Sequence, residues 1–153
     1  MYNAEDILKE KSREMICVSP EVTLAEALAV MLENKIGAIL VKENEDIVGI
    51  WTERDLMKNV TEDGFHTKTS QIKNFMTKTL FSAPHDVSLF SLLDMFLGKR
   101  LRHLLIKKEN KYIGLISTGD VIKTSLNEKS RELDELNEKY NWDYYENWKF
   151  QKK

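Results

Sequence analysis

The chain contains few of the residues that hold a fold together through covalent bonds or metal ions. It has one cysteine and three histidines among 153 residues. Because a single cysteine, Cys17, cannot form a disulfide within the chain, the composition favours a reducing, intracellular compartment. His66, His85 and His103 are scattered along the sequence, and none stands at metal-ligand spacing from Cys17. The sequence therefore predicts neither a disulfide framework nor a metal site.

An excess of charge of one sign is also missing, as is a long apolar run. The formal net charge is −2, charged residues make up 31% and hydrophobic residues 42%. A nucleic-acid surface requires a basic field, which this balance does not provide. No stretch approaches the roughly 18 uncharged apolar residues of a membrane span, and residues 1–11 show no apolar signal region. We therefore expect a folded, cytoplasmic protein that binds neither nucleic acid nor membranes.

Catalytic motifs are absent as well. The sequence has no glycine-rich phosphate loop and no serine nucleophile elbow. Cys17 lies in an apolar stretch, where a small packing residue is expected rather than a nucleophile. The sequence therefore predicts that the protein is not an enzyme.

What the chain does contain is an internal repeat. Residues 18–58 align with residues 83–123 at a constant shift of 65 positions, and nine of the 41 pairs are identical. The identical pairs are Val22/Val87, Leu24/Leu89, Leu28/Leu93, Leu32/Leu97, Leu40/Leu105, Lys42/Lys107, Gly49/Gly114, Asp55/Asp120 and Lys58/Lys123. Two copies of one small unit predict a single globule with a pseudo-two-fold axis. A site made by one copy should then have a counterpart made by the other.

Each copy is predicted to form a strand, a helix, a second strand, a turn, a third strand and a second helix. Apolar runs bounded by polar residues mark the strands. They lie at residues 15–18, 36–41 and 47–51 in the first copy and at 80–82, 103–107 and 112–116 in the second. The fold class is therefore an α/β (α+β) duplication, in which two three-stranded sheets with helices on them pack together.

Apolar residues at helical spacing identify the faces that we expect to be buried. Thr23 and Glu26 form a capping box that begins the first of these helices. Its predicted buried face consists of Leu24, Ala27, Leu28, Met31 and Leu32. Four methionines, Met31, Met57, Met76 and Met95, are expected to fill gaps in the core.

Segments outside the repeat complete the chain. Residues 3–12 are expected to form a helix capped by Asn3, and residues 71–76 to mirror it. The last helix is expected to continue to about Tyr140. The predicted boundaries place the first unit at 3–60, a linker at 61–70, the second unit at 71–124 and a helical, aromatic-rich extension at 125–153.

The end of that extension is dense in aromatic side chains between residues 141 and 150. Such residues usually pack against another surface. Two interpretations remain open: the tail docks on the protein's own dimer, or it anchors a partner protein.

The junction between the last strand and the last helix of each copy carries the most informative motif. Thr52 and Ser117 are predicted helix N-caps, and Asp55 and Asp120 follow three residues later. This pattern is typical of a capping box, which needs no ligand. A helix N-terminus also presents unpaired N–H groups and a positive dipole to anions. In addition, a carboxylate beside a hydroxyl can bind both hydroxyls of a ribose.

A second pair of motifs precedes the middle strand of each copy. Gly37 and Ala38 leave room for a flat group near the backbone. Arg102 and His103 stand at the equivalent positions and suit a phosphate. Gly37 is equally consistent with a helix C-cap, and Arg102 and His103 with a solvated strand end.

Taken together, the paired motifs resemble the CBS domain, and the chain is similar to stand-alone proteins made of one tandem pair of these domains. The resemblance covers about residues 3–126. Its motifs lie at residues 18–20, 35–38, 49–55, 74–77, 100–104 and 114–120. Each motif is weak alone, but their order and spacing are specific.

The resemblance implies a Bateman module, in which two units pack through their sheets and the module pairs into a disc-shaped homodimer. It also implies an adenosine derivative in the clefts between the units: AMP, ADP, ATP, NAD or S-adenosylmethionine, as a regulatory ligand and not as a catalytic cofactor. Ligand would then change the shape of the dimer, provided that it binds one arrangement of the units better than another. The alternative is a CBS dimer that binds no nucleotide and recognises a partner through its aromatic tail.

Site residues follow from the resemblance by position. Those placed near a ligand are Ile16, Val18, Gly37, Ala38, Thr52, Arg54, Asp55, Arg102, His103, Ser117 and Asp120. The two aspartates would hold ribose hydroxyls, with the two N-cap hydroxyls beside them. The arginines and the histidine would face phosphates. Residues 16–18 and 81–83 would line the base pocket. Because Gly119 stands where the first copy has Arg54, the second site would carry less charge.

Overall fold

The computed structural model describes residues 1–140, with side chains up to residue 136. The predictions for residues 141–153, including the aromatic tail, lie outside the described residues. The elements, in chain order, are α1 (Ala4–Lys11), β1 (Cys17–Val18), α2 (Leu24–Asn34), β2 (Ala38–Glu43), β3 (Asp46–Thr52), α3 (Glu53–Asn59), the 3-10 turn η1 (Ile72–Asn74), β4 (Ser82–Pro84), α4 (Leu89–Gly98), β5 (His103–Lys108), β6 (Lys111–Ser117) and α5 (Thr118–Tyr140).

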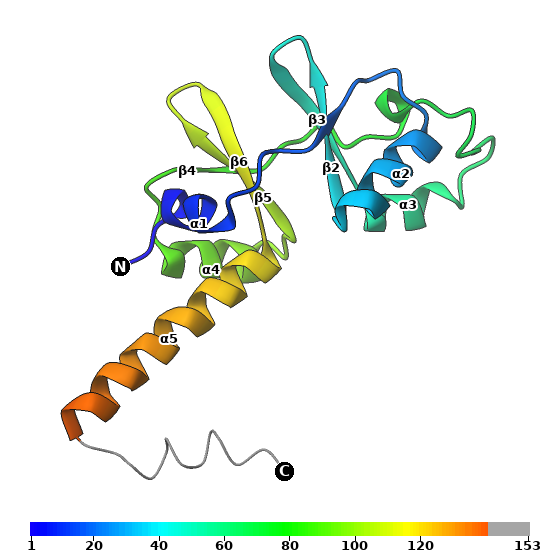
Figure 1. Cartoon of the computed structure of the whole chain (residues 1–153). Helices are drawn as coiled ribbons and strands as arrows, with labels where there is room; N and C mark the ends of the chain where they lie inside the picture. Colours follow the sequence, from blue (N-terminus) through cyan, green and yellow to red (C-terminus); the bar gives the residue numbers. More distant parts are fainter. Residues whose placement is uncertain (141–153) are drawn as a thin grey trace, which may run out of the picture.

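These elements form two units of the same design, which lie side by side in Figure 1. One sheet has the order β1-β2-β3 and the other β4-β5-β6. In each, the first pair is parallel and the second antiparallel. Even the registers repeat: Cys17 pairs with Leu40 in the first sheet, and Ser82 pairs with Leu105 in the second. The predicted duplication and fold class are therefore confirmed.

Each unit has its own apolar core between its sheet and helices. In the first core, Leu24 and Met31 of α2 pack with Trp51 of β3. In the second, Leu92 of α4 packs with Ile116 of β6. All five side chains are buried. The Trp51 indole N–H also donates to Asn59 Oδ1 at 2.8 Å, which satisfies a buried polar group within the core.

The segments before each repeat are exchanged between the units. The helix α1 precedes the first unit but packs against β6 and α5 of the second. The backbone of α1 also contacts the second unit, because the Ala4 N–H donates to Val87 O at 2.9 Å. Conversely, the turn η1 packs on the first unit, where Ile72 N–H donates to Val22 O at 2.9 Å. Each unit is thus completed by the segment that precedes the other unit.

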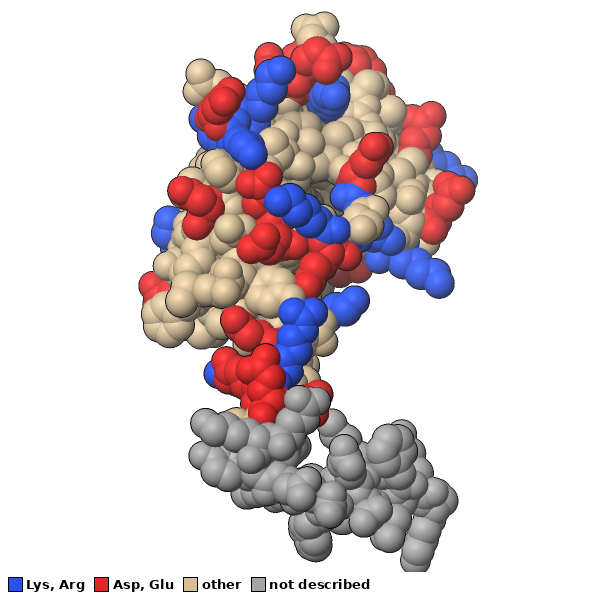
Figure 2. Space-filling view, turned by 60° about the vertical axis from the view of Figure 1, so that its left-hand side comes forward, with Lys and Arg blue, Asp and Glu red and all other residues tan. Residues whose placement is uncertain are grey.

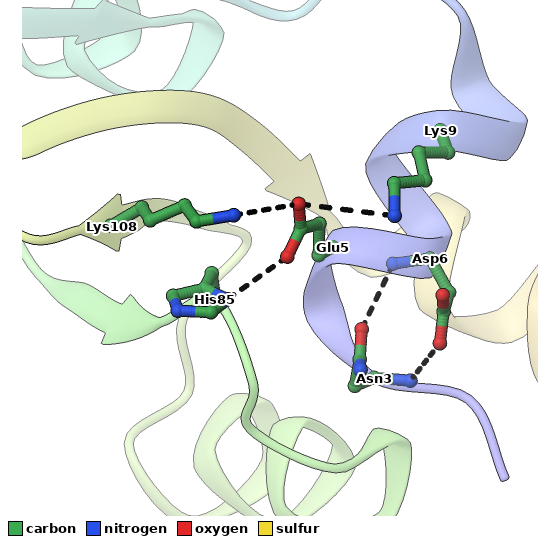
Figure 3. A network of polar contacts seen from close by, with 6 residues as sticks. All are labelled: Asn3, Glu5, Asp6, Lys9, His85 and Lys108. Atoms are coloured by element: carbon green, nitrogen blue, oxygen red, sulfur yellow. Dashed lines mark hydrogen bonds and ion pairs between the residues drawn. The ribbon is translucent and has the colours of Figure 1, made fainter.

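Polar contacts anchor α1 in this exchanged position (Figure 3). Asn3 and Asp6 form the capping box at its start. Glu5 accepts from Lys108 Nζ at 3.0 Å and lies 3.0 Å from His85 Nδ1, both residues of the second unit. The hydrogen bond from Lys108 is the main reason why the pKa of Glu5 lies below its usual value. The predicted N-terminal helix is confirmed, but residues 71–76 contain only a single 3-10 turn where a matching helix was expected.

Two predictions of buried residues are wrong. Leu32 is 78% exposed and Met57 is 70% exposed, although both lie at core-like positions of their helices. Leu97, the repeat partner of Leu32, is likewise 78% exposed. These predictions fail for a common reason, because each of these side chains lies on a face of its helix that points away from both cores.

Surface charge and helix length agree with the composition. Figure 2 shows acidic and basic side chains interspersed over one face of the molecule, without a continuous field of one sign. Within the described part of the chain, every helix is too short or too polar to cross a bilayer.

Candidate functional site

A cleft of about 290 Å³ lies between the two units. The first unit contributes the end of β3 and the start of α3. The second unit contributes the segment before β4 and the start of β5. The lining residues are Gly37, Ile50, Thr52, Glu53, Arg54, Asp55, Lys58, Thr77, Thr79, Leu80, Phe81, Leu101, Arg102, His103, Leu105 and Leu115. Six of the predicted site residues are therefore brought together here: Gly37, Thr52, Arg54, Asp55, Arg102 and His103.

Asp55 sits in this cleft as the N3 residue of a capping box, as predicted. Its Oδ2 atom accepts from the Thr52 N–H at 3.0 Å and from the Thr52 hydroxyl at 3.1 Å. In return, the Asp55 N–H donates to Thr52 Oγ1 at 3.2 Å. Among the described residues, no hydrogen bond reaches Asp55 Oδ1 and no cation pairs with the carboxylate. The cap uses one carboxylate oxygen and leaves the other available to a ligand.

Three cationic side chains reach the same cleft from both units: Arg54 and Lys58 of α3, and Arg102 beside β5. None of them forms a salt bridge with any described residue. Two carboxylates, Glu53 and Asp55, lie in the same lining, so the formal charge of the cleft is positive by one. Arg102 is exposed and suited to charge pairing. Lys58 was not among the predicted site residues, although its identity with Lys123 in the repeat was a usable signal.

His103 opens β5 and is half-buried in the cleft. Desolvation lowers its pKa, and the nearby Lys11 ammonium lowers it further. Asp120 and Glu53 act in the opposite direction but do not outweigh these effects. The imidazole is therefore neutral near pH 7, where it can donate one hydrogen bond and accept another without attracting a phosphate through charge.

Gly37 lies at the edge of the cleft, close to the end of the exposed Glu53 side chain. A Cβ atom at this position would lie 3.1 Å from Glu53 Oε2. The residue that ends α2 in the left-handed conformation is Lys35, with φ 53°. The alternative interpretation of Gly37 as the helix C-cap is therefore wrong.

The counterpart site in the second unit is different. Ser117 and Asp120 form the predicted capping box at the start of α5. Lys11 Nζ donates to Asp120 Oδ2 at 2.7 Å, so a cation already pairs with this carboxylate. The neighbouring cavity has only about 50 Å³ and is lined by Lys11, Arg13, Glu14, Met15, Ile16, Ile36, Ala38 and Leu115. Of the predicted site residues, Ile16 and Ala38 lie here, whereas Val18, Ser117 and Asp120 line neither cavity.

Comparison with known proteins agrees with this geometry. The CBS domain family model matches residues 4–62 and 72–127. The mitochondrial CBS domain-containing protein CBSX3 of Arabidopsis thaliana is 26% identical over 142 residues, which cover 86% of this chain and 68% of that protein. The inosine-5'-monophosphate dehydrogenase of Methanocaldococcus jannaschii is 36% identical over 113 residues, but these cover 72% of this chain and only 22% of the enzyme.

Two solved structures are similar over most of the chain. A CBS-domain containing protein from Agrobacterium tumefaciens has 32% sequence identity and a TM-score of 0.75, covering 81% of this chain and 99% of that one. The structure of CBSX2 in complex with AMP has 21% identity and a TM-score of 0.70, covering 84% and 99%, and shares the fold. The two sheets have the same topology, a cleft lies between the two units, and the family model matches both halves of the chain. The chain belongs to the CBS domain family and consists of a tandem pair of these domains.

Proposed function

We propose that the protein is a regulatory module that binds a phosphorylated adenosine derivative in the cleft between its two units. The observation that carries the proposal is the composition of this cleft: a capping carboxylate with one oxygen that no described residue contacts, and three cations without ionic partners in the described part of the chain. A ribose diol can bind to the Asp55 carboxylate. Arg54, Lys58 and Arg102 can bind phosphate oxygens.

Size and charge narrow the class of ligand. The cleft volume of about 290 Å³ is close to the lower end of the roughly 300–1,000 Å³ typical of small-molecule sites. Its excess of cations favours AMP, ADP or ATP over S-adenosylmethionine, which carries a positive sulfonium. The CBSX2 structure contains AMP, which makes a mononucleotide the first candidate for this chain as well.

Such a ligand would act as a signal because the cleft belongs to both units. Arg54 and Asp55 come from the first unit, and Phe81 and Arg102 come from the second. A nucleotide that contacts all four favours the arrangement in which the units approach each other, and it shifts the equilibrium by its difference in affinity. The protein would then act as a sensor and would catalyse no reaction.

The exposed helical face supports the homodimer that belongs to this proposal. Phe90 and Leu97 of α4 are 80% and 78% exposed, Leu32 of α2 is 78% exposed, and Ile122 of α5 is 50% exposed. Because Leu32 and Leu97 occupy matching positions, the two units present related apolar surfaces. A two-fold interface requires such a self-complementary patch on each protomer.

Ligand-induced thermal stabilisation tests the proposed function. AMP, ADP or ATP at about 100 times its dissociation constant adds about 2.7 kcal/mol, which raises Tm by roughly 5–10 °C in a domain of this size. We expect Asp55→Ala to abolish this rise relative to its own ligand-free Tm. Asp46→Ala, which removes an exposed carboxylate at the start of β3, should retain it.

Other outcomes would contradict the proposal in different ways. A larger rise with S-adenosylmethionine than with AMP would contradict the assignment to anionic nucleotides. No rise with any adenosine derivative would favour the alternative, a CBS dimer that recognises a partner without binding a nucleotide.

A further inference from the structure

The second unit contains a partly buried ion pair that the first unit lacks. Lys11 extends from the end of α1, and its Nζ atom donates to Asp120 Oδ2 at 2.7 Å and to Leu115 O at 3.0 Å. Both charged side chains are only 23% exposed. Burial alone would raise the pKa of Asp120, but the hydrogen bonds from Lys11 and Ser117 lower it below its usual value. The Asp120 carboxylate is therefore held ionised by a cation of the same chain.

The repeat identifies the segment of the first unit that corresponds to α1. Asn3 forms a β-bridge with Ser88, and Gln71 forms one with Thr23, the repeat partner of Ser88. Asn3 and Gln71 are therefore equivalent positions, 68 residues apart (71 − 3).

The same shift applies further along the two segments. A Cβ atom at Gly114 would contact Leu8, and one at Gly49 would contact Met76, which is also 68 positions (76 − 8) beyond Leu8. Beyond Met76 the shift changes, because it is 65 from residue 18 onward, and the residues of this stretch that line the cleft are the uncharged Thr77 and Thr79.

This cation distinguishes the surroundings of the two aspartates. Asp55 faces a cavity of about 290 Å³, to which the segment after Met76 contributes two threonines and no cation. Asp120 is covered by a lysine, and the cavity next to it has about 50 Å³. A ribose that approached Asp120 would have to displace a partly buried, charge-assisted hydrogen bond, which is among the stronger kinds in proteins.

We propose that the Lys11 side chain occupies the ribose position of the second unit, so that the chain binds one nucleotide, at Asp55, and residue 11 keeps the second site closed. The inference rests on the proposed function, because it describes where and how often the same ligand binds. It also assigns to the N-terminal helix a role in ligand stoichiometry, in addition to its packing on β6.

Calorimetric titration with AMP tests the inference. We expect wild-type protein to bind one AMP per chain, with binding lost in Asp55→Ala and retained in Asp120→Ala. Lys11→Thr replaces the cation with a residue type that lines the cleft of the first unit and should bind two AMP per chain. The second binding event should disappear when Asp120→Ala is added. Lys9→Thr is the matched control, because Lys9 lies on the same helix and is 69% exposed; it should bind one.

A reciprocal variant keeps the test decisive if Lys11→Thr fails to fold. Thr79→Lys places a cation in the cleft lining that includes Asp55, where it should pair with that carboxylate as Lys11 pairs with Asp120 and lower the affinity for AMP at least tenfold. Two AMP per wild-type chain would overturn the inference and leave the proposed function intact. A folded Lys11→Thr that still binds one, or a Thr79→Lys of unchanged affinity, would also overturn it. No binding by wild-type protein would overturn the proposed function itself.

Discussion

At the scale of single residues, His103 connects the two halves of the candidate site. Its ring lines the cleft, and the Lys11–Asp120 pair and Glu53 influence it electrostatically. Burial of the ring disfavours its charged form, and so does the ammonium of Lys11. The histidine therefore makes the stability of the fold depend on pH.

The direction of this dependence follows from linkage. Because the pKa of His103 in the folded protein lies below its usual value of 6.5, the unfolded chain binds more protons at acidic pH. The stabilisation is present above that value and is lost as pH falls through the folded pKa. We expect the free energy of unfolding, measured with urea between about pH 7 and pH 5, to fall less steeply in His103→Gln than in wild-type protein.

The control for this measurement is His66→Gln, which changes an exposed histidine of the segment between the units. It should follow the wild-type curve. Equal slopes for His103→Gln and wild-type protein would show that His103 titrates alike in the folded and unfolded states.

Residues near one another in sequence could be predicted, and distant pairs could not. The capping boxes of Thr52 with Asp55 and of Ser117 with Asp120 follow from a spacing of three positions, and both are present. The contact of Lys11 with Asp120 spans 109 positions. It joins an unremarkable helical lysine to a capping residue, so it has no local signature and depends on the placement of α1.

At the scale of elements, close packing of the exchanged segments depends on one glycine in each sheet. Gly114 of β6 lies beneath Leu8 of α1, and an added Cβ would come within 2.5 Å of a Leu8 methyl carbon. Gly49 of β3 stands in the same relation to Met76. The identity of these two glycines in the repeat therefore has a packing explanation.

Gly114→Ala is expected to destabilise the fold by about 1–3 kcal/mol through overpacking against Leu8. Chemical denaturation of the single variants and of the double variant Leu8→Ala/Gly114→Ala measures the effect. Because Leu8→Ala removes the clashing methyl groups, the double variant should lose less stability than the sum of the two single variants.

Gly98→Ala provides the control, since no atom lies within 4 Å of the added Cβ. Located in the last turn of α4, it should leave stability unchanged or raise it slightly. Additive losses in the Leu8/Gly114 cycle would contradict the packing explanation.

The type and the chain order of the elements could be predicted from the sequence, but which elements pack against each other could not. Hydrophobic periodicity correctly indicated the helices and strands of both copies, including the continuation of α5 to Tyr140. It assigned Leu32 to the core because an apolar residue at helical spacing looks the same whether it faces its own sheet or another surface. The expectation for Met57 rests instead on the use of methionine to fill gaps in cores. Periodicity also gave no indication that α1 would pack on the second unit.

At the scale of the whole molecule, the proposed homodimer would form through exposed apolar side chains. These side chains are Leu32 of α2, Phe90 and Leu97 of α4, and Ile122 of α5. In Figure 1, α4 and the first turns of α5 lie along the lower side of the second unit. Their exposure in one chain leaves apolar surface that a second chain would cover.

Leu97→Glu is expected to convert a dimer of twice 17.9 kDa into a monomer, because it places a charge in the apolar contact. Light scattering coupled to gel filtration measures the mass. Asn110→Glu, which introduces the same side chain in the exposed turn between β5 and β6, should remain dimeric. A monomeric wild-type protein, or a dimeric Leu97→Glu, would contradict this assignment of the interface.

The exchange of segments between the units has a consequence for synthesis on the ribosome. The helix α1 is made long before the strand that it covers, with 106 positions (114 − 8) between Leu8 and Gly114. The first unit is complete once residues 71–77 have left the exit tunnel, because it does not use α1. The first unit can therefore mature while the second is still being made, whereas α1 has no docking surface until β6 has emerged.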